Sequence, residues 1–205
     1  MRSAEPSDHV STNRLESFSD GVLAVAITLL VLNIQVPPVG GDLAHKLGHN
    51  WPAYAAYVTS FVTIGIIWIN HHAMISRLRV ADHAILMLNL VLLMSVAVIP
   101  FATSLLATYL REGHGQSLAA AIYGGVLCAM GVSFATLNWH ILFRKRHMLA
   151  EPLSDERRRQ IIFRSARGVV PYMVATGLAV VSPYVTLVIC AAVATYYALP
   201  LGSGG

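Results

Sequence analysis

Residues 14–32 read RLESFSDGVLAVAITLLVL, a polar head joined to an apolar run that contains no charged residue. The apolar run ends at Pro37 and Pro38, and proline does not continue a helix. We predict a helix over residues 14–36. At 1.5 Å per residue it would be roughly 34 Å long, which is enough to cross the hydrocarbon core of a bilayer.

The composition is typical of a membrane protein. Of the 205 residues, 56% are hydrophobic and only 12% are charged, whereas a soluble domain carries about 25% charged residues. The net charge of +4 does not indicate a nucleic-acid partner. The basic residues stand at the ends of apolar runs and not on a basic face with interleaved aromatics, so no nucleic acid is expected to bind.

Further apolar runs follow the first one along the chain. We expect helices over residues 51–75, 80–110 with a bend at Pro100, 117–143, 159–181 with a kink at Pro171, and 184–199. The predicted fold class is therefore an all-α integral membrane protein with six transmembrane helices per subunit. Residues 144–160 are predicted to form an aqueous loop.

The placement of Lys and Arg predicts the orientation in the membrane. Basic residues precede the first helix and lie in the connections 76–79 and 144–167, which alternate along the chain and so share one side. The other side has only Lys46 and Arg111. Because cytoplasmic loops carry the excess of basic residues, we expect a cytoplasmic N-terminus.

The polar head of the first helix needs partners. Charges close to hydrocarbon cost several kcal/mol unless they are paired or face water or protein. We expect Arg14, Glu16 and Asp20 to be paired, with solvation by water at the interface as the alternative. Asn13 is expected to cap the helix, with Glu16 completing a capping box.

Two motifs point to a known family. Arg14-x-x-x-Phe18-Ser19-Asp20, followed by a small residue and an apolar helix, resembles the signature of the transmembrane protein 175 family of potassium channels. Trp68-Ile69-Asn70-His71-His72 resembles that family's Trp-x-x-His-His ending of the second helix. The layout of about six helices in a chain of this size resembles the bacterial members.

This resemblance implies a passive potassium-preferring channel in the bacterial plasma membrane. It implies a homotetramer whose first helices line a central pore, with permeant potassium ions and lipid as the other partners. The matching constriction positions are Val25, Leu29 and Leu32, with Thr28 beside them. Spacings of three, four and seven place them on one helix face. Ordinary packing or lipid contact is the alternative for the apolar three.

Thr28 would offer its hydroxyl to a cation or bond back to the carbonyl of Ala24. Stacked apolar rings can gate by dewetting. The family usually has isoleucine or leucine in the first ring, so Val25 predicts a looser constriction here.

The resemblance also implies a polar network at the cytoplasmic pore mouth. Its expected members are Arg14, Phe18, Ser19, Asp20, Trp68, Asn70, His71 and His72. Which histidine faces Asp20 is left open. The predicted domains are a cytoplasmic N-terminal tail over residues 1–13, the six-helix transmembrane channel domain over 14–200, and a cloning remnant or disordered tail over 201–205.

Other functions find less support. Adjacent histidines point about 100° apart on a helix, so His71 and His72 are not expected to bind one metal ion. No Gly-x-Ser-x-Gly-like context supports catalysis, and we predict no enzyme, catalytic residue, metal or cofactor. A secondary transporter and a non-conducting membrane scaffold remain alternatives. The helix interiors carry almost no charges, which argues against ion-coupled transport.

Overall fold

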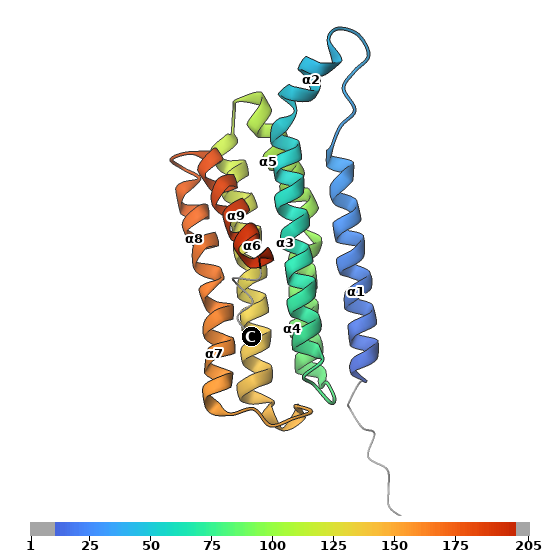
Figure 1. Cartoon of the computed structure of the whole chain (residues 1–205), viewed down its shortest axis with the longest axis vertical. Coiled ribbons are helices and arrows are strands. Elements are labelled where there is room, and N and C mark those ends of the chain that lie inside the picture. Colours follow the sequence, from blue (N-terminus) through green and yellow to red (C-terminus); the bar gives the residue numbers. More distant parts are fainter. Residues whose placement is uncertain (1–10, 200–205) are drawn as a thin grey trace, which may run out of the picture.

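The computed structural model describes residues 11–199, which form helices joined by short connections (Figure 1). Residues 1–10 of the predicted tail over 1–13, residue 200 and the predicted tail over 201–205 lie outside the described range. The end of the N-terminal tail is already helical, because α1 begins at Thr12. The helices are α1 (Thr12–Leu29) with the 3-10 turn η1 (Leu30–Asn33), α2 (Leu43–His49), α3 (Trp51–Ile75), α4 (His83–Ala97), α5 (Ile99–Glu112), α6 (Gln116–Trp139) with the π-helical turn η2 (His140–Arg144), the 3-10 turn η3 (Arg146–Met148), α7 (Asp155–Arg167), α8 (Val169–Leu178) and α9 (Pro183–Ala198).

Side-chain caps and turn residues set several of these boundaries. Asp82 accepts from the Ile85 amide at the start of α4 (3.0 Å), and Ser154 accepts from the Arg157 amide at the start of α7 (3.2 Å). Such caps satisfy backbone donors that a helix leaves unpaired at its N-terminus. Gly113 ends α5 with φ +80°, a conformation that glycine adopts without strain.

The first helix begins differently from the prediction. Ser11, and not Asn13, is the N-cap residue, and its side chain makes no capping hydrogen bond. Glu16 does not form a capping box, because its carboxylate contacts His72 on α3. The helix also ends at Asn33, before the predicted Val36.

The predicted helix over residues 80–110 is interrupted close to Pro100, where a bend was predicted. The run over residues 80–110 forms α4 and α5, which meet at Val98, with Pro100 in the first turn of α5. Proline is tolerated there because the first amides of a helix have no intrahelical acceptor.

The fifth predicted helix was placed too late. The chain becomes helical at Asp155, inside the predicted aqueous loop, because Ser154 caps it and Asp155 and Glu156 favour a helix N-terminus. The interruption falls at Gly168, between α7 and α8, and not at Pro171, which lies in the first turn of α8. The short helix α2, whose cap is Asp42, was not predicted.

Within residues 11–199, four helical segments are long and apolar enough to cross a membrane: Thr12–Asn33, Trp51–Ile75, His83–Glu112 and Gln116–Arg144. α9 is apolar but shorter, and α7 is rich in arginine. In Figure 1 α7 and α8 stack end to end along α6, and α9 covers only part of the bundle's height. The all-helical membrane class is confirmed.

The basic connections gather at one end of the bundle. The start of α1, the end of α3, the end of α6 and the start of α7 all lie at that end in Figure 1. These are the segments that the distribution of Lys and Arg predicted to share one side. We call this end of the molecule the basic end.

Candidate pore face and its polar support

Helix α1 stands at the edge of the subunit. It packs against α3, α4 and α5, and it lies on the opposite side of the bundle from α7 and α8 (Figure 1). A smaller share of its residues is buried than in the other three membrane-capable segments. One face of α1 is therefore available to a neighbour.

The two faces of α1 differ sharply in burial. Leu15, Ser19, Leu23, Ala26 and Leu30 face the subunit core and are buried. The other face is exposed, and it holds Val25, Leu29 and Leu32, with exposed fractions of 56%, 43% and 73%. All four predicted constriction residues, Thr28 included, lie on this exposed face.

The exposed face of α1 also holds a glycine and a threonine. Gly21 lies on it, and a Cβ built there would meet nothing within 4 Å in the subunit. Small residues on a membrane helix favour close approach of another helix. The Thr28 hydroxyl donates to the carbonyl of Val25 at 2.9 Å, whereas the predicted alternatives were a cation and the carbonyl of Ala24. We call the face formed by Phe18, Gly21, Val25, Thr28, Leu29 and Leu32 the α1 face.

A buried chain of hydrogen bonds ties the opposite side of α1 to α3 and α4. The Ser19 hydroxyl donates to the Leu15 carbonyl (2.8 Å), and Asn89 Nδ2 on α4 donates to Ser19 Oγ (3.0 Å). Asn89 Oδ1 then meets His71 Nε2 on α3 at 2.8 Å.

The direction of this chain assigns the tautomer of His71. Ser19 has used its only proton on the Leu15 carbonyl, so it must accept from the Asn89 amide. The Asn89 oxygen therefore faces His71, and His71 Nε2 carries the proton that it donates. His71 Nδ1 is buried and has no hydrogen-bond partner among the described residues.

Two further contacts link the polar head of α1 to the end of α3. Trp68 Nε1 donates to the Asp20 carboxylate at 3.0 Å, and His72 Nδ1 contacts the Glu16 carboxylate. Neither histidine hydrogen-bonds to Asp20, so the indole is its partner in the subunit. Glu16 was not among the predicted network residues.

The remaining predicted network residues lie elsewhere. Arg14 and Phe18 are exposed on the subunit surface. Asn70 donates to the Ile66 carbonyl at 2.8 Å and lines a cavity on the side of α3 that faces α6 and α7. Within one subunit the structure thus brings together Ser19, Asp20, Trp68, His71 and His72, joined by Glu16 and Asn89.

The far end of α1 has its own anchor. Asn33 Nδ2 donates to the Pro100 carbonyl at 3.0 Å, where α5 begins. Polar contacts therefore hold α1 near both ends, and apolar contacts hold it between them. This arrangement fixes the rotation of α1 about its axis and hence which residues its exposed face presents.

Charge pairing at the basic end stabilises the connections. Lys145 Nζ lies 2.6 Å from Asp82 Oδ2, which joins the start of α4 to the segment after α6. Burial alone would raise the pKa of Asp82. The bonded Lys145 ammonium and Ile85 amide outweigh it and hold this pKa below its usual value of 3.8.

Comparison with known proteins identifies the family. The family model described as endosomal/lysosomal potassium channel TMEM175 matches residues 14–100, from α1 to the first turn of α5. A potassium channel of Streptomyces collinus is 45% identical over 188 residues, 91% of each chain. The chain belongs to the TMEM175 family.

A solved TMEM175 structure agrees in fold as well as in sequence. It is the crystal structure of a lysosomal potassium-selective channel TMEM175 homolog from Chamaesiphon minutus, with a TM-score of 0.80 and 38% identity over 91% of this chain and 96% of that one. The resemblance inferred from the two motifs is thereby confirmed. Family members are ion channels, which are not enzymes.

A more distant TMEM175 relative is named a proton channel and not a potassium channel. The endosomal/lysosomal proton channel TMEM175 of Mus musculus is 34% identical over 117 residues, 52% of this chain and 23% of that protein.

Asn89, which links Ser19 on α1 to His71 on α3, was not among the predicted residues. A lone amide between Leu88 and Leu90 in an otherwise apolar run was the available signal, since polar side chains inside membrane helices usually find a partner.

Proposed function

We propose that this TMEM175 chain is a potassium-preferring cation channel that conducts passively. In this proposal four copies assemble with their α1 faces around a common axis. The observation that carries the proposal is the exposure of Val25, Thr28, Leu29 and Leu32 on a helix whose opposite face is fixed to the subunit. A single α1 cannot enclose a pore, so conduction requires oligomerisation.

The constriction would consist of stacked apolar rings. Val25, Leu29 and Leu32, one copy from each subunit, would narrow the path and exclude water when closed. A cation passing them loses hydration water, so the rings would discriminate by size and by dehydration energy. The Thr28 hydroxyl bonds to a backbone carbonyl, and its oxygen retains a lone pair for a passing cation.

The polar network would set the geometry of the pore. Ser19, Asp20, Trp68, His71 and His72, with Glu16 and Asn89, fix the rotation of α1 near the basic end. In the assembled channel Arg14 and Phe18 are exposed to a neighbouring subunit, and Arg14 would find its partner there.

The topology that fits this function has six spans. α7 with α8 would form the fifth and α9 the sixth, with the arginines of α7 at the interface, where long side chains can reach water. The basic end would face the cytoplasm of a bacterial plasma membrane, with the N-terminus on that side.

The test is ion flux into liposomes that contain only the purified chain. We expect potassium influx faster than sodium influx, and exclusion of N-methylglucamine. Saturable flux with alternating access would favour the secondary transporter. No flux from a folded tetramer, under all tested voltages and pH values, would favour the non-conducting scaffold.

A further inference from the structure

A second site lies on the other side of α3 from the pore face. An open-sided cavity of about 380 Å³ is lined by residues of α3, α6, α7, α8 and α9 and of their connections. This volume falls within the range of about 300–1,000 Å³ that small-molecule sites occupy. Among the residues that the structure describes, α9 ends at Ala198, short of the basic end, and the cavity opens on this side of the bundle (Figure 1).

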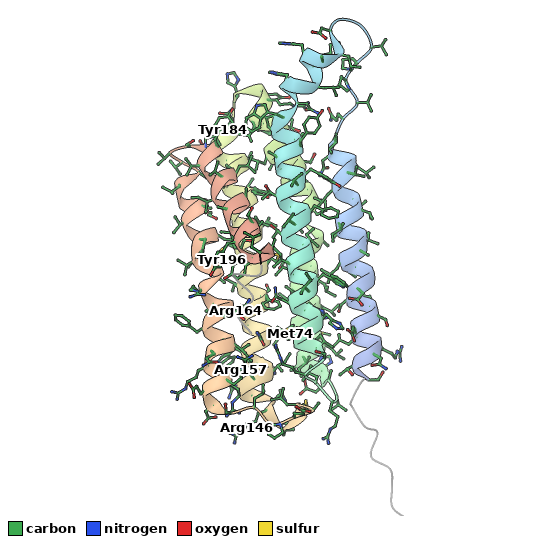
Figure 2. The ribbon with its side chains drawn as sticks, in the orientation of Figure 1. Met74, Arg146, Arg157, Arg164, Tyr184 and Tyr196 are labelled. Atoms are coloured by element: carbon green, nitrogen blue, oxygen red, sulfur yellow. The ribbon has the colours of Figure 1, made fainter. Side chains whose placement is uncertain are left out.

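The wall of the cavity changes character with depth. Towards the basic end it carries Arg77, Arg157, Gln160, Arg164, Asn70 and Asn138. Towards the middle of the bundle it carries Ile67, Met130, Tyr172, Val193 and Ala194. Along the long axis of the bundle, Figure 2 shows Arg146 at the basic end, then Arg157, then Arg164, and then Tyr196 on α9. A ligand that fills the cavity must therefore be polar at one end and apolar at the other.

The polar end is positively charged. Arg77 and Arg157 line this end of the cavity and, among the described lining residues, none is Asp or Glu. Burial, together with the nearby charge of Arg157, lowers the pKa of Arg77. Like charges held close together favour a bound anion.

The position of Arg77 is fixed by the backbone. The Arg77 carbonyl accepts from the Ala150 amide at 2.8 Å, and the Arg79 amide donates to the Met148 carbonyl at 2.9 Å. These bonds hold the α3–α4 connection against the segment before α7. Arg158 differs from its neighbour Arg157, because its guanidinium pairs with Asp155.

We propose that this cavity binds an anionic phospholipid from the leaflet at the basic end. Its phosphate would lie between Arg77 and Arg157, and part of an acyl chain would fill the apolar end. The planar guanidinium matches phosphate oxygens in two-bond geometry. Anionic lipids of the inner leaflet gather at basic residues near the membrane surface. A free phosphate would leave the apolar half of the cavity empty.

The site is separate from the pore, and its test does not depend on conduction. The full chain is purified in a neutral detergent and incubated with equal amounts of phosphatidylglycerol and phosphatidylcholine. Retained lipid is then counted by native mass spectrometry. We expect the parent chain to retain phosphatidylglycerol in preference to phosphatidylcholine.

Matched arginine variants locate the headgroup. Arg77→Gln with Arg157→Gln should reduce retention at least about tenfold, because hydrogen bonds to charged groups are strong. Arg79→Gln with Arg159→Gln removes the same charge from two exposed arginines that do not line the cavity, and it should retain lipid like the parent. Equal retention by the first pair and the parent, or equal loss in both pairs, overturns the proposal.

Two further measurements test the lipid tail. Ile66 lines the cavity and is half-buried, so Ile66→Trp should fill it and reduce retention, whereas Val132→Trp on the exposed side of α6 should not. This comparison carries the test if the Arg77 and Arg157 variant does not fold, and equal retention by both tryptophan variants then refutes the site.

Inorganic phosphate should leave the melting temperature of the protein unchanged. A shift equal to that given by phosphatidylglycerol would identify a phosphate site and overturn the lipid.

Discussion

Asn89 shows how one amide can orient a helix in a membrane protein. Its amide nitrogen donates to Ser19 on α1, and its amide oxygen accepts from His71 on α3. The hydrogen bonds run from His71 through Asn89 and Ser19 to the Leu15 carbonyl in one direction. A rotation of α1 by one residue would remove Ser19 from this chain.

Replacing Asn89 should expose this dependence. Asn89→Leu leaves the Nε2 proton of His71 without an acceptor in a buried site, which costs about 1–3 kcal/mol. We expect a lower apparent melting temperature of the purified protein, with Asn13→Leu on the exposed start of α1 as the neutral control. In a His71→Leu background the same change should cost less, because the stranded donor is gone. Additive effects of the two substitutions would contradict the chain.

At this scale the sequence predicted residue identities better than their contacts. The Phe-Ser-Asp and Trp-x-x-His-His motifs marked Ser19, Asp20, Trp68, His71 and His72, which the fold does bring together. The partners could not be read, because they depend on how α1, α3 and α4 are rotated against one another. Glu16 was therefore assigned to a cap, and Asn70 to a network from which it points away.

Helix α1 combines a fixed inner face with an unpartnered outer one. The small residue Gly21 lies on the outer face, and nothing in the same subunit approaches it. No contact within the chain therefore requires a small residue there, and the proposed tetramer predicts that a neighbouring subunit does.

Gly21→Leu separates folding from assembly. Leucine favours a helix over glycine by roughly 1 kcal/mol, so the subunit should remain helical. The tetramer fraction measured by chemical crosslinking should fall, because the new side chain blocks close approach of adjacent α1 helices. Gly125→Leu is the matched control, since a Cβ at Gly125 also meets nothing within 4 Å. A normal tetramer fraction for Gly21→Leu would place α1 away from the subunit contacts.

The bounds of helices with an unbroken apolar run could be predicted from the sequence. Helices that begin with charged residues or are very short could not. The range 51–75 matches α3 at both ends, because Pro52 marks its start and polar residues follow its end. The start of α7 was missed, because its first turns are charged and only the Ser154 cap marks them. α2 was missed because it is only seven residues long.

The whole molecule is polarised along its long axis. Basic connections gather at one end, and Asp82 with Lys145 joins two of them. Their positions followed from the sequence, because membrane-spanning helices of similar length alternate direction. The cavity beside α9 did not follow, because it depends on where that helix stops within the bundle.

Acid should lower the folding stability of the protein by protonating Asp82 at the basic end. The pKa of Asp82 in the folded protein lies below its ordinary value of 3.8, so the ionised carboxylate stabilises the fold above that pH. This contribution is lost as the pH falls through the folded-state pKa. We expect Asp82→Asn to lower the apparent melting temperature at pH 6, by an amount that corresponds to about 1 kcal/mol or less, and to have a smaller effect at pH 3.

Lys145→Gln should reproduce this pH dependence, and Arg79→Gln should not. An Asp82→Asn effect of the same size at both pH values would show that the ion pair does not contribute.

The most direct test of the account places single cysteines on the α1 face of the conducting protein. Leu29→Cys and Leu32→Cys are compared with Leu90→Cys, an exposed position on α4, and the parent chain with Cys128 and Cys190 gives the baseline. A positively charged thiol reagent is added during potassium flux into liposomes. If α1 lines the pore, the reagent blocks flux through Leu29→Cys and Leu32→Cys and leaves flux through Leu90→Cys and the parent unchanged. Complete labelling of both α1 cysteines without any change in flux would contradict a pore lined by α1.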